Sequence, residues 1–550
     1  MKRKRKILFL LGALCLTACV KEPVVPGNNP VTTPTQETEA PQVTETACAT
    51  EAPEITDMPE ETKAPEITET PEVKEETVPV RLYMENKEIV EREEARQLYA
   101  VIWQNPLIGG EDEAKYPAVS TVFKSLRTMR DQNAETVVSE LAGVAEELKQ
   151  YADEMDVSCY DSTRYYVQRA DNHIISMRCN QSVSTGSIHP MSVVSGFNFS
   201  TETGDVLSLS DVVTDPGRIR EVVKQELAEK YEDCLFEEWE TLYQEIETDD
   251  LAWTLDYDGL TFYFSPYTLS YYAAGVLTAE VDFADEPALF RSVYMEAPEQ
   301  GSASAVTFHS YTELGGADGK TDTLWVGQYK EDTDDYRLRL EVEKNGESIL
   351  GFEVYAYEYK AYLVTVEDKY YLFAEATNDN EYQILYIFDL SEEFITDPIV
   401  QMNAGFAKVG INAEGDGYGY VEDIFNNPAE IRLSSRIDVF CTMRGTRSYS
   451  FDAKTGTLIP QTDFYTLNES MAPLISKIPL EVTMVGDNTK ATVPAGTEFT
   501  FLRSDGDTYV EFRLPDGREC RVTRDNGEEW PYTVDGVPEE ECFDGLGYAG

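Results

Sequence analysis

The spacing of hydrophobic and polar positions changes along the chain, and it predicts helices in two places. Residues 117–152 carry apolar side chains three and four positions apart, with Val119, Val122, Phe123 and Leu126 on one face, so we expect a long amphipathic helix. A second helix is expected over roughly 216–232, since Asp215-Pro216 is typical of a helix start. Residues 95–103 predict a strand that ends in a turn at Asn105-Pro106.

Alternating segments in the same region predict three hairpins. The first joins 160–169 to 173–183, the second joins 195–200 to 205–209 across Thr203-Gly204, and the third joins 254–257 to 260–264 across Asp258-Gly259. Because helices and hairpins mix here, the pattern predicts an α+β domain over residues 80–300.

The remaining chain shows strand signals only. Residues 301–477 predict a β-rich domain, either a sandwich or an irregular propeller-like array, with short strands at 325–329, 338–342, 352–357, 370–373 and 383–390. Residues 478–550 alternate over short segments separated by glycine turns, which predicts a small SH3-like β-barrel. The expected fold class is therefore an α+β domain followed by a β-rich region that ends in this barrel.

The N-terminus has the three parts of an export signal. Met1–Lys6 is basic, Ile7–Leu16 is apolar, and Leu16-Thr17-Ala18-Cys19 resembles the lipobox of bacterial lipoproteins. The apolar run is too short for a membrane-spanning helix, which needs about 20 residues. The resemblance implies that residues 1–18 are a signal peptide and that Cys19 carries diacylglycerol. An ordinary signal peptide with a chance cysteine is the alternative.

Residues 19–79 are expected to be the lipidated Cys19 followed by a disordered stalk. The segment is rich in Pro, Thr and Glu, and Ala52-Pro-Glu-Ile-Thr56 recurs as Ala64-Pro-Glu-Ile-Thr68. Such a composition buries too little apolar surface to offset the entropy lost on ordering. We therefore expect a protein anchored by lipid to the cell membrane, on its extracytoplasmic face, at a Gram-positive surface.

Composition limits the partners. The chain has 550 residues, 42% of them hydrophobic, and a formal net charge of −57. This charge argues against nucleic acid and against direct contact with anionic lipid headgroups, and it favours basic partners or divalent cations. General solubility is the alternative reason for the charge.

Cysteine and histidine are sparse beyond the stalk. Cys520 and Cys542 are expected to form a disulfide, while free buried thiols are the alternative for the other cysteines. The three histidines include no metal-binding HExxH pattern, and the GxSxG and SxxK patterns of serine enzymes are absent. No catalytic residue is predicted.

One segment has the spacing of a calcium-binding loop. Asn412, Glu414, Asp416 and Asp423 stand at positions 1, 3, 5 and 12 of an EF-hand pattern, with Gly417 at position 6. Calcium is the one candidate cofactor. A solvated acidic, glycine-rich loop is the alternative.

Three motifs resemble a known extracytoplasmic domain. They are the segments 186–190, 199–211 and 262–275, the last of which reads FYFSPYTLSYYAAG. In this order they resemble the lysozyme-binding sensor domain of the anti-sigma factor RsiV, which also occurs beside peptidoglycan deacetylases. The resemblance covers roughly residues 95–290. It departs from the family at Ile188, and the chain shows neither the sigma-binding segment nor the transmembrane helix of RsiV.

The resemblance implies a binding surface made by His189, Tyr267, Tyr271 and Tyr272. Tyrosine suits such a surface because it offers a large contact area at low entropic cost. For His189 the alternative is a hydrogen bond to loop backbone, and for the tyrosines it is core or cross-strand packing.

The function expected from these observations is extracytoplasmic binding or sensing. The resemblance implies a lysozyme-like muramidase as ligand, and a cell-wall glycan such as peptidoglycan is a second candidate. A cell-wall hydrolase or other envelope enzyme is the first alternative function, and a structural spacer is the second.

Overall fold

The structure is a computed structural model. It describes residues 76–94, 96–149, 159–186, 189–314, 322–330, 336–344, 347–367, 369–378, 382–392, 394–414, 417–468, 471–525, 527 and 530–548. The chain divides between Glu76 and Thr77, and Thr77–Gly550 forms one compact unit. Cys19 and almost all of the predicted stalk lie outside the described residues.

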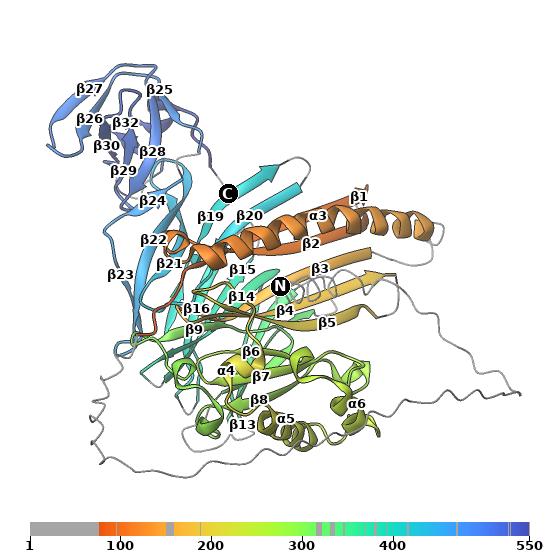
Figure 1. Cartoon of the computed structure of the whole chain (residues 1–550). Helices are drawn as coiled ribbons and strands as arrows, with labels where there is room; N and C mark the ends of the chain where they lie inside the picture. The colour runs from red at the N-terminus through yellow and green to blue at the C-terminus, as the bar shows by residue number, and fades with distance from the viewer. Residues whose placement is uncertain are drawn as a thin grey trace, which may run out of the picture. The chain divides into compact units, whose positions relative to one another are not determined.

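A seven-stranded sheet organises the N-terminal part of this unit, in the order β19-β20-β1-β2-β3-β4-β5 (Figure 1). Its strands are β1 (Leu82–Glu93), β2 (Arg96–Ile108), β3 (Cys159–Ala170), β4 (Ile174–Thr185), β5 (Met191–Ser200), β19 (Lys408–Glu414) and β20 (Gly417–Asp423). Neighbours are antiparallel except β2 and β3. Strands from both sides of residue 300 therefore share one sheet.

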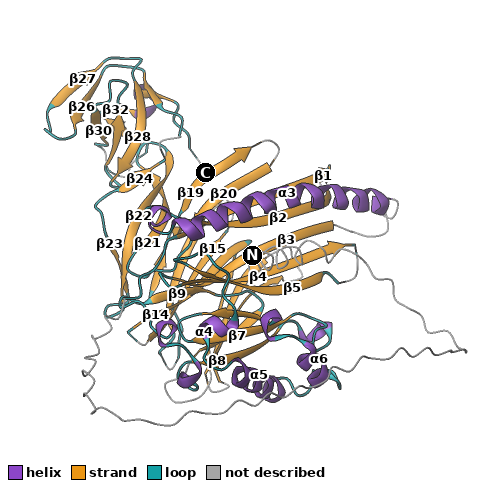
Figure 2. Ribbon diagram, in the orientation of Figure 1, coloured by secondary structure: helices purple, strands orange, loops and turns teal. Residues whose placement is uncertain are grey.

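The long helix α3 (Pro117–Leu148) connects the parallel pair β2 and β3, after the short helix α2 (Asp112–Lys115). Its buried side chains include Val119, Phe123 and Leu126, which confirms the helical spacing seen in the sequence. Phe123 meets Phe199 of β5 edge to face, with ring centroids 5.4 Å apart. The helix thus covers one face of the sheet (Figure 2).

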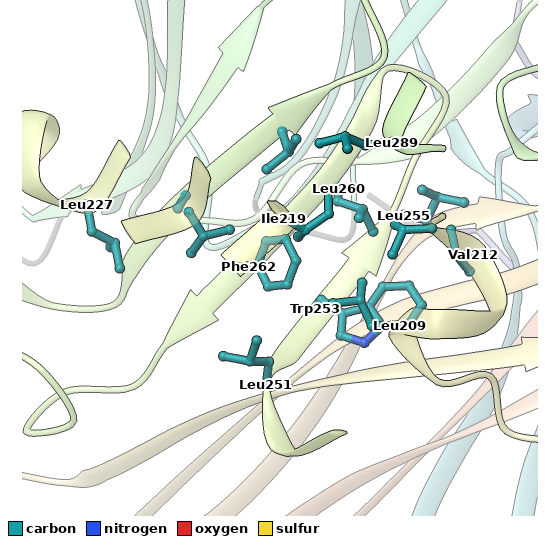
Figure 3. Close-up of a cluster of buried hydrophobic side chains, with 14 of the residues drawn as sticks. Leu209, Val212, Ile219, Leu227, Leu251, Trp253, Leu255, Leu260, Phe262 and Leu289 are labelled. Carbon is teal, nitrogen blue, oxygen red and sulfur yellow. The ribbon is translucent and has the colours of Figure 1, made fainter. Parts of the chain in front are cut away.

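Residues 201–295 add a second small layer. Its elements are α4 (Leu209–Val212), α5 (Pro216–Lys230), α6 (Trp239–Glu245), η2 (Thr248–Asp250), β6 (Ala252–Leu255), β7 (Gly259–Phe264), η3 (Tyr272–Ala274), β8 (Leu277–Asp282), η4 (Pro287–Leu289) and η5 (Ser292–Tyr294). The apolar face of α5 packs on the β6-β7-β8 sheet, as Ile219, Trp253 and Phe262 show in Figure 3. The predicted second helix and third hairpin are confirmed.

One glycine allows this layer to lie directly on the large sheet. A Cβ atom at Gly196 of β5 would fall 1.8 Å from the carbonyl oxygen of Trp253 in β6. No side chain fits in that space, so the two sheets touch through their backbones. Asn198 strengthens the contact, because its Nδ2 donates to the same Trp253 oxygen at 2.9 Å.

Arg169 connects the same two layers from inside. Its side chain is 0% exposed, and its Nε donates to Asp171 Oδ2 at 2.6 Å. Its other nitrogens donate to the carbonyl oxygens of Asp256, Tyr294 and Glu296 at 2.6–3.1 Å. The guanidinium also lies 4.5 Å from the ring centroid of Tyr257. One buried charge therefore holds two segments, 256–257 and 294–296, against β3.

Two further sheets pack face to face. A four-stranded sheet has the order β10-β11-β12-β13, and a five-stranded sheet has the order β17-β16-β15-β14-β9. They share a core that includes Leu338 and Phe388. The strands are β9 (Ser302–Ala305), β10 (Ser310–Leu314), β11 (Asp322–Lys330), β12 (Tyr336–Lys344), β13 (Glu347–Tyr355), β14 (Glu358–Val366), β15 (Lys369–Thr377), β16 (Gln383–Asp389) and β17 (Val400–Met402).

The C-terminal part is a twelve-stranded sheet that crosses the predicted boundary at 477, since β24 pairs with β28. Its strands are β18 (Ala404–Phe406), β21 (Ile431–Asp438), β22 (Thr442–Asp452), β23 (Thr457–Pro460), β24 (Tyr465–Leu467), β25 (Leu474–Ser476), β26 (Leu480–Met484), β27 (Lys490–Val493), β28 (Glu498–Ser504), β29 (Tyr509–Arg513), β30 (Glu519–Thr523) and β33 (Phe543–Asp544). The strands β31 (Thr533–Val534) and β32 (Val537–Pro538) precede α7 (Glu539–Cys542). The body is thus mostly β with few helices, and the sheets of the described residues include no closed barrel.

Three local predictions are corrected. Asn105-Pro106 lies inside β2 and does not form a turn. Residues 205–209 form a single bridge, Phe199 to Val206, rather than a strand, because the capping box of Ser208 and Asp211 starts α4. Cys520 and Cys542 are free buried thiols, and Cys542 Sγ donates to the Val537 oxygen at 3.7 Å.

No helix among the described residues is long and apolar enough to span a membrane.

Candidate functional site

A loop between β7 and β8, residues 265–276, carries the predicted tyrosines. Its first turn is tight: the Tyr267 N–H donates to the Ser270 oxygen at 3.1 Å, and the Thr268 N–H donates to the Ser265 oxygen at 3.0 Å. Tyr267 has a φ of 69°, a left-handed conformation that costs a non-glycine residue of order 1–3 kcal/mol. The surrounding contacts must therefore hold this turn in place.

Contacts on both sides fix the loop. Leu269 is fully buried in the core below it, and its carbonyl oxygen accepts from the Phe236 N–H at 2.9 Å. Ser265 Oγ accepts from the Val194 N–H of β5 at 2.9 Å. The loop is thus anchored to the segment after α5 and to the edge of the large sheet, which leaves its tyrosines fixed at the surface.

The aromatic side chains on and beside this loop form two neighbouring ring groups. The His189 ring stacks on Tyr272 with centroids 4.6 Å apart and an interplanar angle of 26°, and Tyr267 lies 5.7 Å from Tyr272 on a tilted plane. Tyr271 meets Phe236 edge to face at 4.8 Å. We call these five residues the aromatic platform. The structure therefore brings the rings of His189, Tyr267 and Tyr272 together, while Tyr271, next to Tyr272 in the chain, packs on Phe236.

Two of these tyrosines have exposed side chains and therefore do not belong to the core. Tyr267 and Tyr271 are each 63% exposed, and His189 is exposed too. By contrast Tyr263, four residues before Tyr267, is buried and exchanges a 2.8 Å hydrogen bond with the Thr254 hydroxyl. Core packing therefore accounts for Tyr263 but not for Tyr267 or Tyr271. Phe236 was not predicted, because it stands alone in a loop with no periodic pattern.

Chemically the platform offers the faces and edges of aromatic rings. Exposed tyrosines held on a fixed loop bury a large area in a partner while losing little side-chain entropy. The arrangement therefore suits binding of a protein or sugar surface.

The proposed calcium segment folds as a hairpin. Asn412 and Glu414 lie on β19, where they pair with Gly419 and Gly417 of β20. Asp416 lies outside the described residues, and Asp423 forms an ion pair with Arg432 at 3.1 Å. Among the described residues no group of three or more His, Cys, Asp or Glu side chains is placed to hold a metal ion. The calcium site stays a prediction.

Carboxylates gather at the other end of the β6–β7 hairpin. Asp256 Oδ1 accepts from the N–H groups of Asp258 and Gly259 at 2.8 Å each. Burial, followed by repulsion from Asp256, raises the pKa of Asp258 to about 7 and that of Asp282 to about 6. The Tyr370 hydroxyl donates a long hydrogen bond of 3.5 Å to Asp258 Oδ2. These groups make stability depend on pH.

Comparison with known proteins identifies one segment. Residues 210–284 match the family described as "Protein of unknown function (DUF3298)". Two solved structures of DUF3298 family members are similar at 15% identity over 40% of this chain. One is from Bacteroides fragilis NCTC 9343, with 99% of its chain covered and a TM-score of 0.32. The other is from Pseudomonas aeruginosa PAO1, with 97% covered and a TM-score of 0.26. No curated protein matches the chain.

The matched segment contains α5, α6, the β6-β7-β8 sheet and four members of the aromatic platform, all except His189. Residues 210–284 are therefore a DUF3298 domain.

Proposed function

We propose that the chain is a lipid-anchored, extracytoplasmic binding protein whose aromatic platform binds a basic muramidase. The observation that carries the proposal is the 63% exposure of Tyr267 and Tyr271 on an anchored loop. The resemblance of the 262–275 motif to a lysozyme-binding sensor domain supports the choice of partner. The net charge of −57 supports it too, since it attracts a basic protein at long range.

Titration calorimetry of the full-length chain with a C-type lysozyme at 0.15 M salt tests the proposal. We expect saturable 1:1 binding that Tyr271→Ala weakens by roughly 30-fold or more, the effect of an interface hot spot. Tyr267→Gly is the second variant, because glycine accepts the left-handed φ of 69° without strain. Tyr311→Ala is the matched control, since Tyr311 is 61% exposed on β10.

Three outcomes contradict this proposal. The first is a platform variant that lowers the thermal midpoint but leaves affinity unchanged, which makes the tyrosines structural. The second is binding that disappears by about 0.3 M salt, where the Debye length is only roughly 6 Å and charge alone explains the attraction. The third is binding to isolated peptidoglycan instead of the enzyme, which shifts the ligand to the wall glycan.

The anchor has its own test. If Cys19 carries the lipid, Cys19→Ala releases the protein to the medium or leaves it unprocessed. A Cys19→Ala protein that stays at the membrane and is processed normally contradicts the anchor. Cys15→Ala, within the expected signal peptide, is the control.

We also propose that residues 478–550 form an SH3-like module within the larger sheet. The continuous antiparallel order β28-β29-β30-β26-β27 supports this. Because β25 pairs with β28 and β33, the module is expected to give a stable fragment that starts just before β25 on limited proteolysis. Cleavage inside β26–β30 as fast as cleavage ahead of β25 contradicts the proposal.

A further inference from the structure

The structure contains a cavity of about 430 Å³, and none of the residues that line it belongs to the aromatic platform. Its walls come from the entry to β1, the loop between β2 and α2, and the segment from Asp423 to Arg432 that joins β20 to β21. Phe406 and Phe425, stacked at 5.4 Å with an interplanar angle of 21°, add an apolar part. The volume falls within the range of small-molecule sites, roughly 300–1,000 Å³.

Two guanidinium groups in this cavity are held in position by carboxylates. Arg432 Nη1 donates to Asp423 Oδ2 at 3.1 Å, and Arg81 Nε lies 3.9 Å from Asp423 Oδ1. Arg81 also pairs with Glu430. Asp423 is 10% exposed, while the two arginine side chains keep 27% and 26% exposure. Each guanidinium has five donors, so both have donors to spare for a ligand oxygen.

Backbone hydrogen bonds hold Arg81 at the wall of the cavity. The Arg81 N–H donates to Asp112 Oδ2 at 2.8 Å, and its carbonyl oxygen accepts from the Gly109 N–H at 2.9 Å. A Cβ at Gly109 would lie 2.8 Å from the Tyr83 ring and 2.9 Å from Arg81 Cγ. A side chain at position 109 would therefore displace the side chain of Tyr83 or Arg81.

The charges of the lining select the ligand class. Arg81 and Arg432 supply two positive charges, and the lining carboxylates supply four negative ones: Glu111, Asp112, Asp423 and Glu430. A simple anion meets the guanidinium groups but is repelled by the excess of carboxylates, and a simple cation leaves the spare guanidinium donors unused. Asp423 and Glu430 are already paired with the two arginines. Glu111 and Asp112 are therefore the lining carboxylates left for a ligand ammonium, while the spare guanidinium donors are left for a ligand carboxylate.

We propose that this cavity binds a small zwitterion, a free amino acid or a short peptide. Its carboxylate accepts from Arg81 and Arg432, its ammonium donates to Glu111 and Asp112, and its side chain lies toward Phe406 and Phe425. The site is independent of the proposed muramidase binding.

Titration calorimetry of the full-length chain tests the site with L-alanine and with L-alanyl-L-alanine, which distinguish the two sources of the zwitterion. N-acetyl-alanyl-alanine lacks the ammonium, and alanyl-alanine amide lacks the carboxylate. We expect 1:1 binding of at least one zwitterion and binding at least about tenfold weaker for both blocked probes, because each loses hydrogen bonds between charged groups.

Variants connect the binding to the cavity. Arg432→Gln is expected to weaken zwitterion binding at least about tenfold, and Arg432→Lys less, because lysine keeps the charge without the planar fork. Arg339→Gln is the control: Arg339 is 41% exposed on β12, with carboxylate partners of its own. If the Arg432→Gln protein does not fold, the Glu430→Gln variant is measured in its place. Glu430 is 49% exposed, so removing its carboxylate leaves no buried charge without a partner.

Absence of heat from both zwitterions up to about 10 mM overturns the proposal. Equal binding of the blocked and unblocked probes overturns it too, and so does unchanged affinity in folded Arg432→Gln and Glu430→Gln proteins.

Discussion

Replacing Arg169 by methionine is expected to separate the DUF3298 domain from the large sheet. The guanidinium is 0% exposed and makes four hydrogen bonds, one to Asp171 and three to carbonyl oxygens of residues 256, 294 and 296. Methionine has a similar length but no donor. The substitution therefore leaves the Asp171 carboxylate without its cationic partner and the three carbonyl oxygens without these donors.

The size of the effect follows from these contacts. Removing one partner of a buried ion pair costs about 3–5 kcal/mol. Asp171 keeps its backbone donors, the N–H groups of His173 and Ile174 at 2.8 and 3.0 Å, so the lower half of this range applies to the pair itself. Each carbonyl oxygen left buried without a donor adds roughly 1 kcal/mol or more. The ion pair and the three carbonyl oxygens together give a total of about 6–7 kcal/mol, which is comparable to the whole stability of a marginal domain.

Hydrogen–deuterium exchange read on peptides from β4 and β6–β8 measures this loss locally. A cost of about 6–7 kcal/mol raises the opening equilibrium by roughly 10⁴- to 10⁵-fold, up to the limit that global unfolding sets. The control is Arg339→Met, which removes an ion pair of a 41% exposed side chain and is expected to cost under about 1 kcal/mol. Exchange in Arg169→Met that rises no more than in the control refutes the reasoning.

Three further predictions concern other parts of the chain. Gly196→Ala is expected to lower the thermal midpoint, with a cost of roughly 1–3 kcal/mol or more, since its Cβ meets Trp253 backbone at 1.8 Å; Gly143→Ala, on α3 with open space around it, serves as the control and should not destabilise. The chain is expected to be more stable at pH 5 than at pH 7.5, because the folded state keeps protons on Asp258 and Asp282 up to pKa values of about 7 and about 6, whereas the unfolded state releases them near pH 4. Asp282→Asn should flatten this dependence, and an unchanged slope would count against it. Calorimetry with Ca²⁺ on the unaltered chain and on the Asp416→Ala variant tests the predicted calcium site. The absence of binding heat, or equal heat in both proteins, contradicts that site.

Local patterns in the sequence predicted much of the N-terminal fold. Helices α3 and α5 and the hairpins β3–β4 and β6–β7 follow the expected spacing. Pro106 was interpreted as a turn, but it lies in β2 opposite Met84, beyond Ile102 where the pairing of β2 with β3 ends. A proline is tolerated there because no neighbouring strand requires its missing N–H on that side. A single sequence does not show where such a partner stops.

Long-range pairing was the other limit. β1 was not predicted, because Leu82–Glu93 is strongly acidic and follows the stalk directly. Its partner β20 lies more than 300 residues later, inside the segment interpreted as a calcium loop. At the candidate site the tyrosines and His189 were predicted from motif resemblance. Phe236, the cavity around Arg81 and the free thiol of Cys542 depend on tertiary contacts that spacing does not encode.

The interior position of β1 sets an order for the maturation of the chain. β1 precedes β2 directly in the chain, whereas its other edge stays open until β20, more than 300 residues later, has reached the same side of the membrane. During that time the chain presents an unpaired strand edge beside its N-terminal segment, so it depends on being kept apart from other copies of itself. A product truncated before residue 417 would keep that edge open permanently and is expected to aggregate or be degraded.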